Sequence, residues 1–188
     1  MFDDFYRDHM TCFKTLQEQK KNIVTAGERL VQVIRYNHKI LICGNGGSAA
    51  DAQHFAAEII VRLQKDRRAL PAVSLTTDTS VLTAAANDLG FDHVFSRQVA
   101  GIGRSGDALV AISTSGNSPN ILNAAKTALQ MNLQVVSLTG SDGGELKSLS
   151  SQWVGVCGNI TARIQEAHIF ILHFWASMIE SAVIQEVS

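Results

Sequence analysis

The sequence predicts an α/β fold, a three-layer doubly wound sheet of five parallel strands preceded by an N-terminal helical arm. Five short apolar runs without alternation lie between residues 39 and 156, and helix-like segments separate them. Such runs are typical of strands buried on both faces of a parallel sheet. The first 36 residues have apolar residues at helical spacing instead. We expect one domain over residues 1–188, with the arm at 1–36 and the α/β body at 37–188.

The arm comes first and carries no visible chemistry, because it lacks Gly-rich or Ser-rich loops. We therefore expect it to pack against the body or against another subunit. The predicted strands follow at residues 39–43, 70–75, 107–113, 133–138 and 152–156. The last predicted helix, about 161–187, is apolar on more than one face, which is typical of a buried helix.

Composition narrows the classes of function. Hydrophobic residues make up 46% of the chain, so subunit contacts are expected to cover some apolar surface. A net charge of −1 argues against a nucleic-acid surface, which needs clustered Lys and Arg. The one local basic cluster, residues 65–68, is interpreted as a solvated helix end.

The same sequence indicates a cytoplasmic protein. Cys12, Cys43 and Cys157 form no CxxC pair, which favours a reducing compartment. The acidic N-terminus lacks the apolar core of a signal peptide. No stretch is expected to reach the ~20 apolar residues of a membrane span.

Two strand–loop–helix junctions offer anion sites. The first predicted strand is followed by residues 44–48 (GNGGS), and the third by residues 113–118 (STSGNS), four of whose six residues carry hydroxyls. Ligands of open α/β sheets bind beyond the carboxyl ends of strands, where helix N-termini offer free N–H groups. Ser118 before Pro119 also predicts a helix N-cap. We expect the second loop to bind phosphate.

A dinucleotide site is the competing interpretation of the first loop. Gly44, Gly46 and Ala49 match the GxGxxG/A pattern after a strand. That pattern needs an acid about 20 residues further on. The end of the next predicted strand, Asp78, lies well past that spacing. A monophosphate fits better.

Four polar side chains on two helices are candidate metal ligands or acid–base groups. His54 and Glu58 are four residues apart and share a helix face. In the last helix, Gln165 and His173 interrupt an apolar stretch and are separated by ~12 Å of helical rise. His168 is an equally good candidate by spacing, so both histidines remain open. A site that joins Gln165 and His173 needs side chains that lean together, or more than one subunit.

As a set, several motifs resemble the phosphoheptose isomerases, a family of SIS-domain proteins with a flavodoxin-like sheet. They are CGNGGSAADAQHFAAE, LTTDTS, ANDLGFDHVFSRQV, STSGNSPN, LTGSDGG and TARIQEAHIFILH, in order from about residue 39 to 173. Two positions depart from the family pattern: Val61 replaces a small residue, commonly glycine, and Leu89 replaces an aromatic.

The resemblance implies an isomerase that converts sedoheptulose 7-phosphate to an aldose through an enediol, in lipopolysaccharide heptose biosynthesis. It implies catalytic roles for Glu58 and His173 and one zinc ion per subunit, bound by His54, Glu58, Gln165 and His173. It implies a homotetramer with sites between subunits. The implied substrate-binding residues are Asn45, Gly46, Gly47, Ser48, Glu58, Asn87, Asp88, Ser113, Thr114, Ser115, Ser118 and Gln165.

Two roles of Glu58 compete within the enzyme. A carboxylate that binds zinc is a weaker base, so Glu58 as a ligand competes with Glu58 as the base.

Two further hypotheses belong to other functional classes. A relative of the family is a non-catalytic tetrameric adaptor for the replication initiator, and lacks histidine at the position of His173. The presence of His54, Glu58, Gln165 and His173 favours the enzyme. SIS regulators normally carry a DNA-binding domain, for which we expect no room in 188 residues.

Overall fold

The computed structural model describes residues 1–185, which contain one five-stranded parallel sheet of order β2-β1-β3-β4-β5. All five predicted strands are confirmed. The direction in which strands are added reverses at β1, which places the crevice of this doubly wound sheet beside the carboxyl end of β1. The strands are β1 (Ile40–Gly44), β2 (Ala72–Ser74), β3 (Ala108–Ser113), β4 (Gln134–Gly140) and β5 (Gln152–Val156).

The three central strands β1, β3 and β4 contribute side chains to two hydrophobic clusters, one on each face of the sheet. In β1, Ile40 and Ile42 face one cluster while Leu41 and Cys43 face the other. Side chains alternate in this way along any strand, and here both faces are apolar. This is why the predicted strands show no polar alternation.

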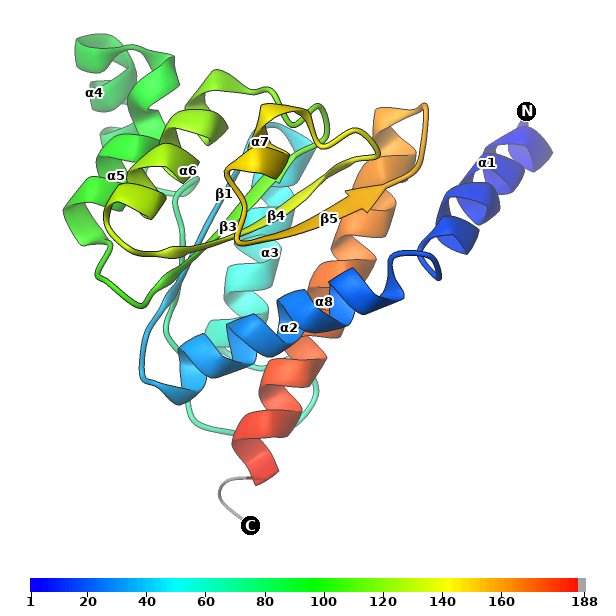
Figure 1. Ribbon diagram of the computed structural model, residues 1–188, viewed down its shortest axis with the longest axis horizontal. Coiled ribbons are helices and arrows are strands. Elements are labelled where there is room, and N and C mark those ends of the chain that lie inside the picture. Colours follow the sequence, from blue (N-terminus) through cyan, green and yellow to red (C-terminus); the bar gives the residue numbers. More distant parts are fainter. Residues whose placement is uncertain (186–188) are drawn as a thin grey trace.

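Helices cover both faces and make the molecule three-layered (Figure 1). The first cluster lies under α2, α3 and α8, and the second under α4 to α7. The helices are α1 (Phe2–Thr15), α2 (Lys20–Arg35), α3 (Gly47–Ile60), α4 (Thr79–Leu89), α5 (Val94–Ile102), α6 (Pro119–Gln130), α7 (Gly144–Ser148) and α8 (Thr161–Gln185), with a 3₁₀ turn η1 (Phe91–His93).

The N-terminal arm is helical as predicted, and its two helices differ in their packing. Helix α2 lies on α8, where the Trp175 indole donates to the Ile23 carbonyl at 2.8 Å. A Cβ on Gly27 would come within 2.4 Å of the Met178 sulfur, so glycine permits this close approach. Helix α1 projects away from the body, and the aromatic side chains of Phe2 and Phe5 are exposed (Figure 1).

Helix α8 is long and apolar enough to cross a membrane by length and composition, with a mean hydropathy of 1.5 in its most apolar window. The expectation that no segment reaches this length is therefore wrong. Half of that window is buried within the protein, against α2, α3 and the sheet. Continuous hydrophobicity in α8 reflects contacts on several sides, as in other core helices.

Candidate functional site

The first Gly-rich loop turns sharply from β1 into α3 at the carboxyl edge of the sheet. Gly46 has φ of +56°, in the region that glycine adopts most easily. A Cβ on Gly44 would lie 2.5 Å from the Ser48 carbonyl oxygen, so a side chain there would collide with backbone. The loop can fold this tightly only with glycine, and its carbonyls accept hydrogen bonds from the first turn of α3: Ser48 N–H bonds to Asn45, and the N–H groups of Ala49 and Ala50 bond to Gly46.

The second loop gathers hydroxyl groups between β3 and α6. The Ser113 hydroxyl lies 3.1 Å from the Ser118 hydroxyl and 3.5 Å from that of Ser115. Ser118 is the N-cap residue and Pro119 begins α6, as predicted, but the Ser118 side chain makes no capping bond. Its hydroxyl faces Ser113 instead. The hydroxyls therefore converge beside a helix N-terminus, an arrangement suited to a phosphate.

Asn120 joins the two loops and was missed by the sequence analysis. Its amide and that of Asn45 exchange two hydrogen bonds of 2.9 Å each. Asn120 is buried, in the first turn of α6. Only its place directly after Ser118-Pro119 could have indicated a role, because turn and cap rules explain the serine and proline but not the asparagine. The reciprocal pair fixes Asn45 toward the hydroxyl loop.

His54, Glu58 and His173 come together where α3 meets α8. The Nε2 atoms of His54 and His173 are 2.8 Å apart, so one ring donates and the other accepts. His54 Nε2 also lies 3.3 Å from Glu58 Oε1. The His54 side chain is 47% exposed and that of Glu58 18%, so the cluster is open to solvent on the His54 side.

This cluster fits a zinc ion by its donor set. The three ligand atoms lie within 4.8 Å of one another, and no other such group of His, Cys, Asp and Glu occurs in residues 1–185. Zinc takes imidazole nitrogen and carboxylate oxygen at ~2.0–2.2 Å, which in a tetrahedron places ligand atoms about 3.3 Å apart. The distances of 2.8 and 3.3 Å between these side chains are close to that spacing.

Gln165 lies two turns away from the cluster. A Cβ on Gly47 would be 2.7 Å from both amide atoms of Gln165, so this side chain covers the start of α3. Along α8, Gln165 meets Gly47 and His173 meets His54, so the two helices run side by side in the same direction. The structure thus brings three of the four expected ligands together and leaves Gln165 at the Gly-rich loop.

His168 is a core residue. It is fully buried, and its Nε2 lies 3.1 Å from the Thr139 carbonyl oxygen at the end of β4. Burial lowers the pKa of His168 to about 4. The choice between the two histidines of α8, which spacing left open, is settled geometrically in favour of His173 as the member of the cluster.

Asn87 and Asp88 are not part of the cluster within one chain. They lie on α4, where the Asn87 amide donates to the Asp88 carboxylate at 2.7 Å. Figure 1 shows α4 at the opposite end of the molecule from the start of α8. Both side chains are exposed.

Asp51 is a second group that the sequence analysis missed. It lies one turn before His54 on α3, and burial raises the pKa of its carboxyl to about 6, while His54 opposes that shift. Its Oδ2 atom is buried without a hydrogen-bond partner in the described chain. An acid inside an Ala-rich helix start is the one signal that the sequence offered.

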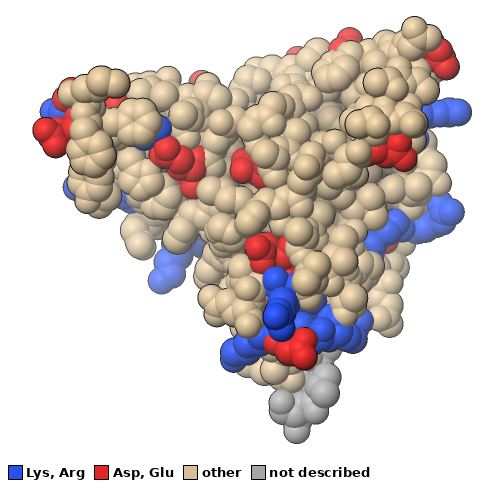
Figure 2. All heavy atoms as spheres, turned by 180° about the vertical axis from the view of Figure 1, so that it is seen from behind, with Lys and Arg blue, Asp and Glu red and all other residues tan. Residues whose placement is uncertain are grey.

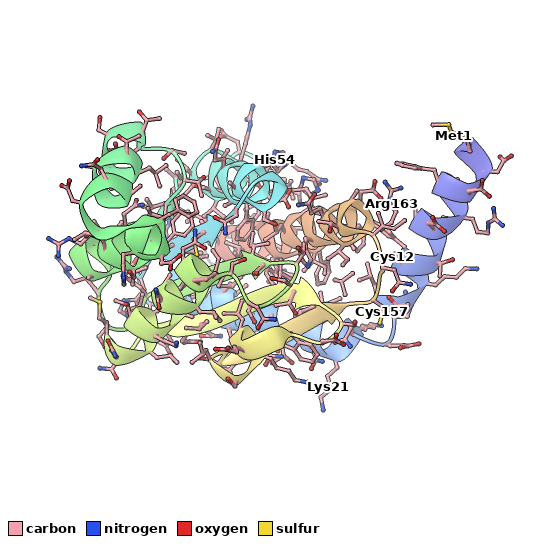
Figure 3. All side chains as sticks on the ribbon, turned by 90° about the horizontal axis from the view of Figure 1, so that it is seen from above. Met1, Cys12, Lys21, His54, Cys157 and Arg163 are labelled. Carbon is pink, nitrogen blue, oxygen red and sulfur yellow. The ribbon has the colours of Figure 1, made fainter. Side chains whose placement is uncertain are left out.

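The part of the molecule around α1 is separate from this cluster. Figure 3 shows Cys12, Cys157 and Arg163 where α1 meets the end of β5 and the start of α8, whereas His54 lies apart from them on α3. A cavity of about 460 Å³ lies among these three residues. It contains none of the expected site residues.

The sequence was compared with protein families and with characterised proteins. The SIS domain family model matches residues 4–140. Phosphoheptose isomerase of Neisseria gonorrhoeae (strain NCCP11945) is 52% identical over 166 residues, covering 86% of this chain and 84% of that protein. The chain belongs to the phosphoheptose isomerase family of SIS-domain proteins.

Solved structures of the family superpose on 96% of this chain. Phosphoheptose isomerase GmhA from Neisseria gonorrhoeae has a TM-score of 0.84 at 46% identity, covering 96% of this chain and 100% of that one. A phosphoheptose isomerase from Francisella tularensis has a TM-score of 0.92 at 33% identity, covering 96% of both chains. The predicted family and fold are confirmed.

Proposed function

We propose that the protein is a ketose–aldose isomerase that converts sedoheptulose 7-phosphate to glycero-manno-heptose 7-phosphate. The observation that carries the proposal is the cluster of His54, Glu58 and His173 between α3 and α8. The hydroxyl-rich loop after β3 accompanies it. Membership of the phosphoheptose isomerase family supports the same reaction. The non-catalytic adaptor is disfavoured, because it has no use for such a cluster.

The residues can move two protons, one between carbons and one between oxygens, through an enediol without any net change in composition. Glu58 takes the proton from C1 of the ketose and returns it to C2, which yields the aldose. His173 moves the second proton between the oxygens on C2 and C1. Asn45, Gly46, Gly47 and Ser48 hold the sugar.

The phosphate end of the substrate is assigned to the second loop. We propose that the hydroxyl and N–H groups of this loop surround it without a lysine. The loop's contributing residues are Ser113, Thr114, Ser115 and Ser118.

We propose zinc as the resident metal. His54, Glu58 and His173 would hold it. Gln165, two turns away in the same chain, would be the fourth ligand by leaning toward them or by coming from a neighbouring subunit. When bound, zinc polarises the substrate carbonyl. The neutral imidazoles and the carboxylate are ligand types that zinc prefers.

We further propose a cytoplasmic homotetramer that supplies heptose to the lipopolysaccharide core. Phe2, Phe5, Phe170 and Phe174 leave apolar surface exposed on α1 and α8, which subunit contacts would cover. Asn87 and Asp88 are exposed on α4 and are not part of the cluster of their own chain, so we propose that they complete the site of a neighbouring subunit. Light scattering coupled to size exclusion measures the assembly directly.

The experiment is to incubate the purified protein with sedoheptulose 7-phosphate in D₂O and follow the sugar by NMR. An enediol mechanism yields the aldose with deuterium at C2. Unchanged sedoheptulose 7-phosphate would contradict the proposal, and binding to a replication initiator by that inactive protein would establish the adaptor instead.

A further inference from the structure

One buried carboxylate ties the segment after α3 to α8. Glu180 is 4% exposed. Its two carboxylate oxygens accept hydrogen bonds from the backbone N–H groups of Leu63 at 3.0 Å, Gln64 at 3.1 and 3.3 Å, and Lys65 at 3.1 Å. Three successive N–H groups that converge on one carboxylate form an anion-binding concavity.

Arg67 completes this contact and reaches the end of α3. Its side chain is 3% exposed, and its Nε lies 3.7 Å from Glu180 Oε1. Its Nη2 donates to the Glu58 carbonyl oxygen at 2.7 Å. That carbonyl is among the last four of α3, which have no partner within the helix. The prediction of a solvated helix end at residues 65–68 is therefore wrong for Arg67, which is a buried cap.

We call Arg67 and Glu180, with the backbone of residues 63–65, the α3–α8 clamp. It lies on the same face of α8 as the candidate catalytic cluster, two turns further along the helix. Glu180 follows His173 by seven residues, two turns along α8, so both face the same neighbouring helix. Figure 2 shows Lys and Arg side chains gathered at this end of the molecule, where the segment after α3 passes the end of α8 in Figure 1.

We infer that Arg67 and Glu180 are positioning residues for the reaction proposed above. Glu58 and His173 reside on different helices, so the lateral placement of α3 and α8 sets the distance between their side chains. Arg67 holds the backbone of Glu58 itself, and Glu180 fixes α8 to the same segment. A misplacement of 1 Å at a reacting group can cost about 100-fold in rate.

Asp107, directly before β3, supplies a matched control outside the contact between α3 and α8. Its carboxylate is 2% exposed and accepts hydrogen bonds from the backbone N–H of Lys39 at 3.0 Å and of Arg104 at 2.8 Å, with Lys39 Nζ at 2.5 Å. It has the chemistry of Glu180, namely a buried acid with backbone and cationic donors. It lies at the start of β3, away from α3 and α8.

The test compares Glu180→Gln, Arg67→Lys and their double variant with Asp107→Asn. Thermal unfolding, kcat and KM for sedoheptulose 7-phosphate, and the Kd for Co²⁺ added to metal-free protein are measured for each. We expect both acid-to-amide variants to lower the melting temperature. Glu180→Gln and Arg67→Lys should lower kcat about tenfold with KM nearly unchanged, and weaken Co²⁺ binding about tenfold. Asp107→Asn should change neither kcat nor Co²⁺ affinity. In the double variant, the loss of catalytic and binding free energy should be smaller than the sum of the losses in the two single variants.

Equal kcat and Co²⁺ affinity in Glu180→Gln and Asp107→Asn, both measured well below their melting temperatures, would overturn the inference. A wild-type protein that binds Co²⁺ but does not isomerise the sugar would refute the proposed function alone, and the Co²⁺ comparison would still decide on the clamp. A wild-type protein with neither property would refute both.

Discussion

The two histidines of α8 lie in opposite surroundings. His168 is fully buried against the carboxyl end of β4, and burial lowers its pKa to about 4. His173 meets His54 and Glu58 on α3, where solvent reaches the cluster. Five residues turn a helix by about 140°, so the two rings face different neighbours. His168 is thus a packing group against the sheet. His173 is a member of the candidate metal cluster beside α3.

The largest expected effect is a loss of turnover on changing Glu58, which lies on α3 beside His173. Glu58→Gln keeps the size of the side chain but removes the base, so turnover of sedoheptulose 7-phosphate should fall at least ~100-fold. Deuterium exchange at C1 should fall with it. Bound zinc, measured in the same samples, separates the roles: retained zinc identifies Glu58 mainly as base, whereas lost zinc identifies it as ligand. Full turnover in this variant would remove Glu58 from the mechanism.

The serine loop gives the next largest effect. Replacing both Ser115 and Ser118 by alanine should raise KM for the sugar phosphate roughly 30-fold, because each neutral donor contributes ~1 kcal/mol and two are lost. The fold should persist, since the Ser118 side chain makes no capping bond to α6. Ser148→Ala, on α7, is the control for loss of a hydroxyl elsewhere. Unchanged kinetics in the double variant would exclude this loop from the phosphate site.

On the sheet side, His168→Asn should act on stability rather than on chemistry. The buried ring loses its contact with the Thr139 carbonyl and leaves space, so the melting temperature should fall by roughly 5 to 10 °C. Turnover per folded molecule should change less than about twofold. A variant that kept its melting temperature but lost turnover would place His168 in the site and reverse the comparison.

The smallest effect is a pair of opposite pH dependences. The pKa of His168 is lowered from 6.5 in the unfolded chain to about 4 in the folded protein. The unfolded chain therefore binds a proton at His168 more readily, and the folded protein loses stability as the pH falls from 6.5 to about 4. The pKa of Asp51 is raised from 3.8 to about 6, so stability is gained as the pH falls through that window. The free energy of unfolding is measured with urea at several pH values from 7 to 4.5. Compared with wild type, its fall with decreasing pH should be steeper for Asp51→Asn and flatter for His168→Asn. Equal slopes in all three proteins would contradict both assignments.

Much of the fold was predictable because burial on both faces marks each strand with an unbroken apolar run. The two loops were predictable for a similar reason, since glycine and hydroxyl residues directly follow β1 and β3. Local patterns of this kind depend on neighbours in sequence, which the chain itself displays.

Contacts across the fold were not predictable in the same way. The sequence could not choose between His168 and His173, because the inward face of α8 is set by α2, α3 and the sheet together. Arg67 looked like a surface charge, since its partner Glu180 is more than 100 residues away. The pairing of Asn45 with Asn120 likewise joins distant segments.

The most direct test is to measure turnover and bound zinc side by side in His173→Asn and wild type, on protein of the same assembly state. If His173 binds the metal and moves protons, the variant should stay folded, lose at least ~100-fold in turnover and lose zinc as well. A stable His173→Asn protein with full activity on sedoheptulose 7-phosphate would contradict the assignment of His173 to the active site.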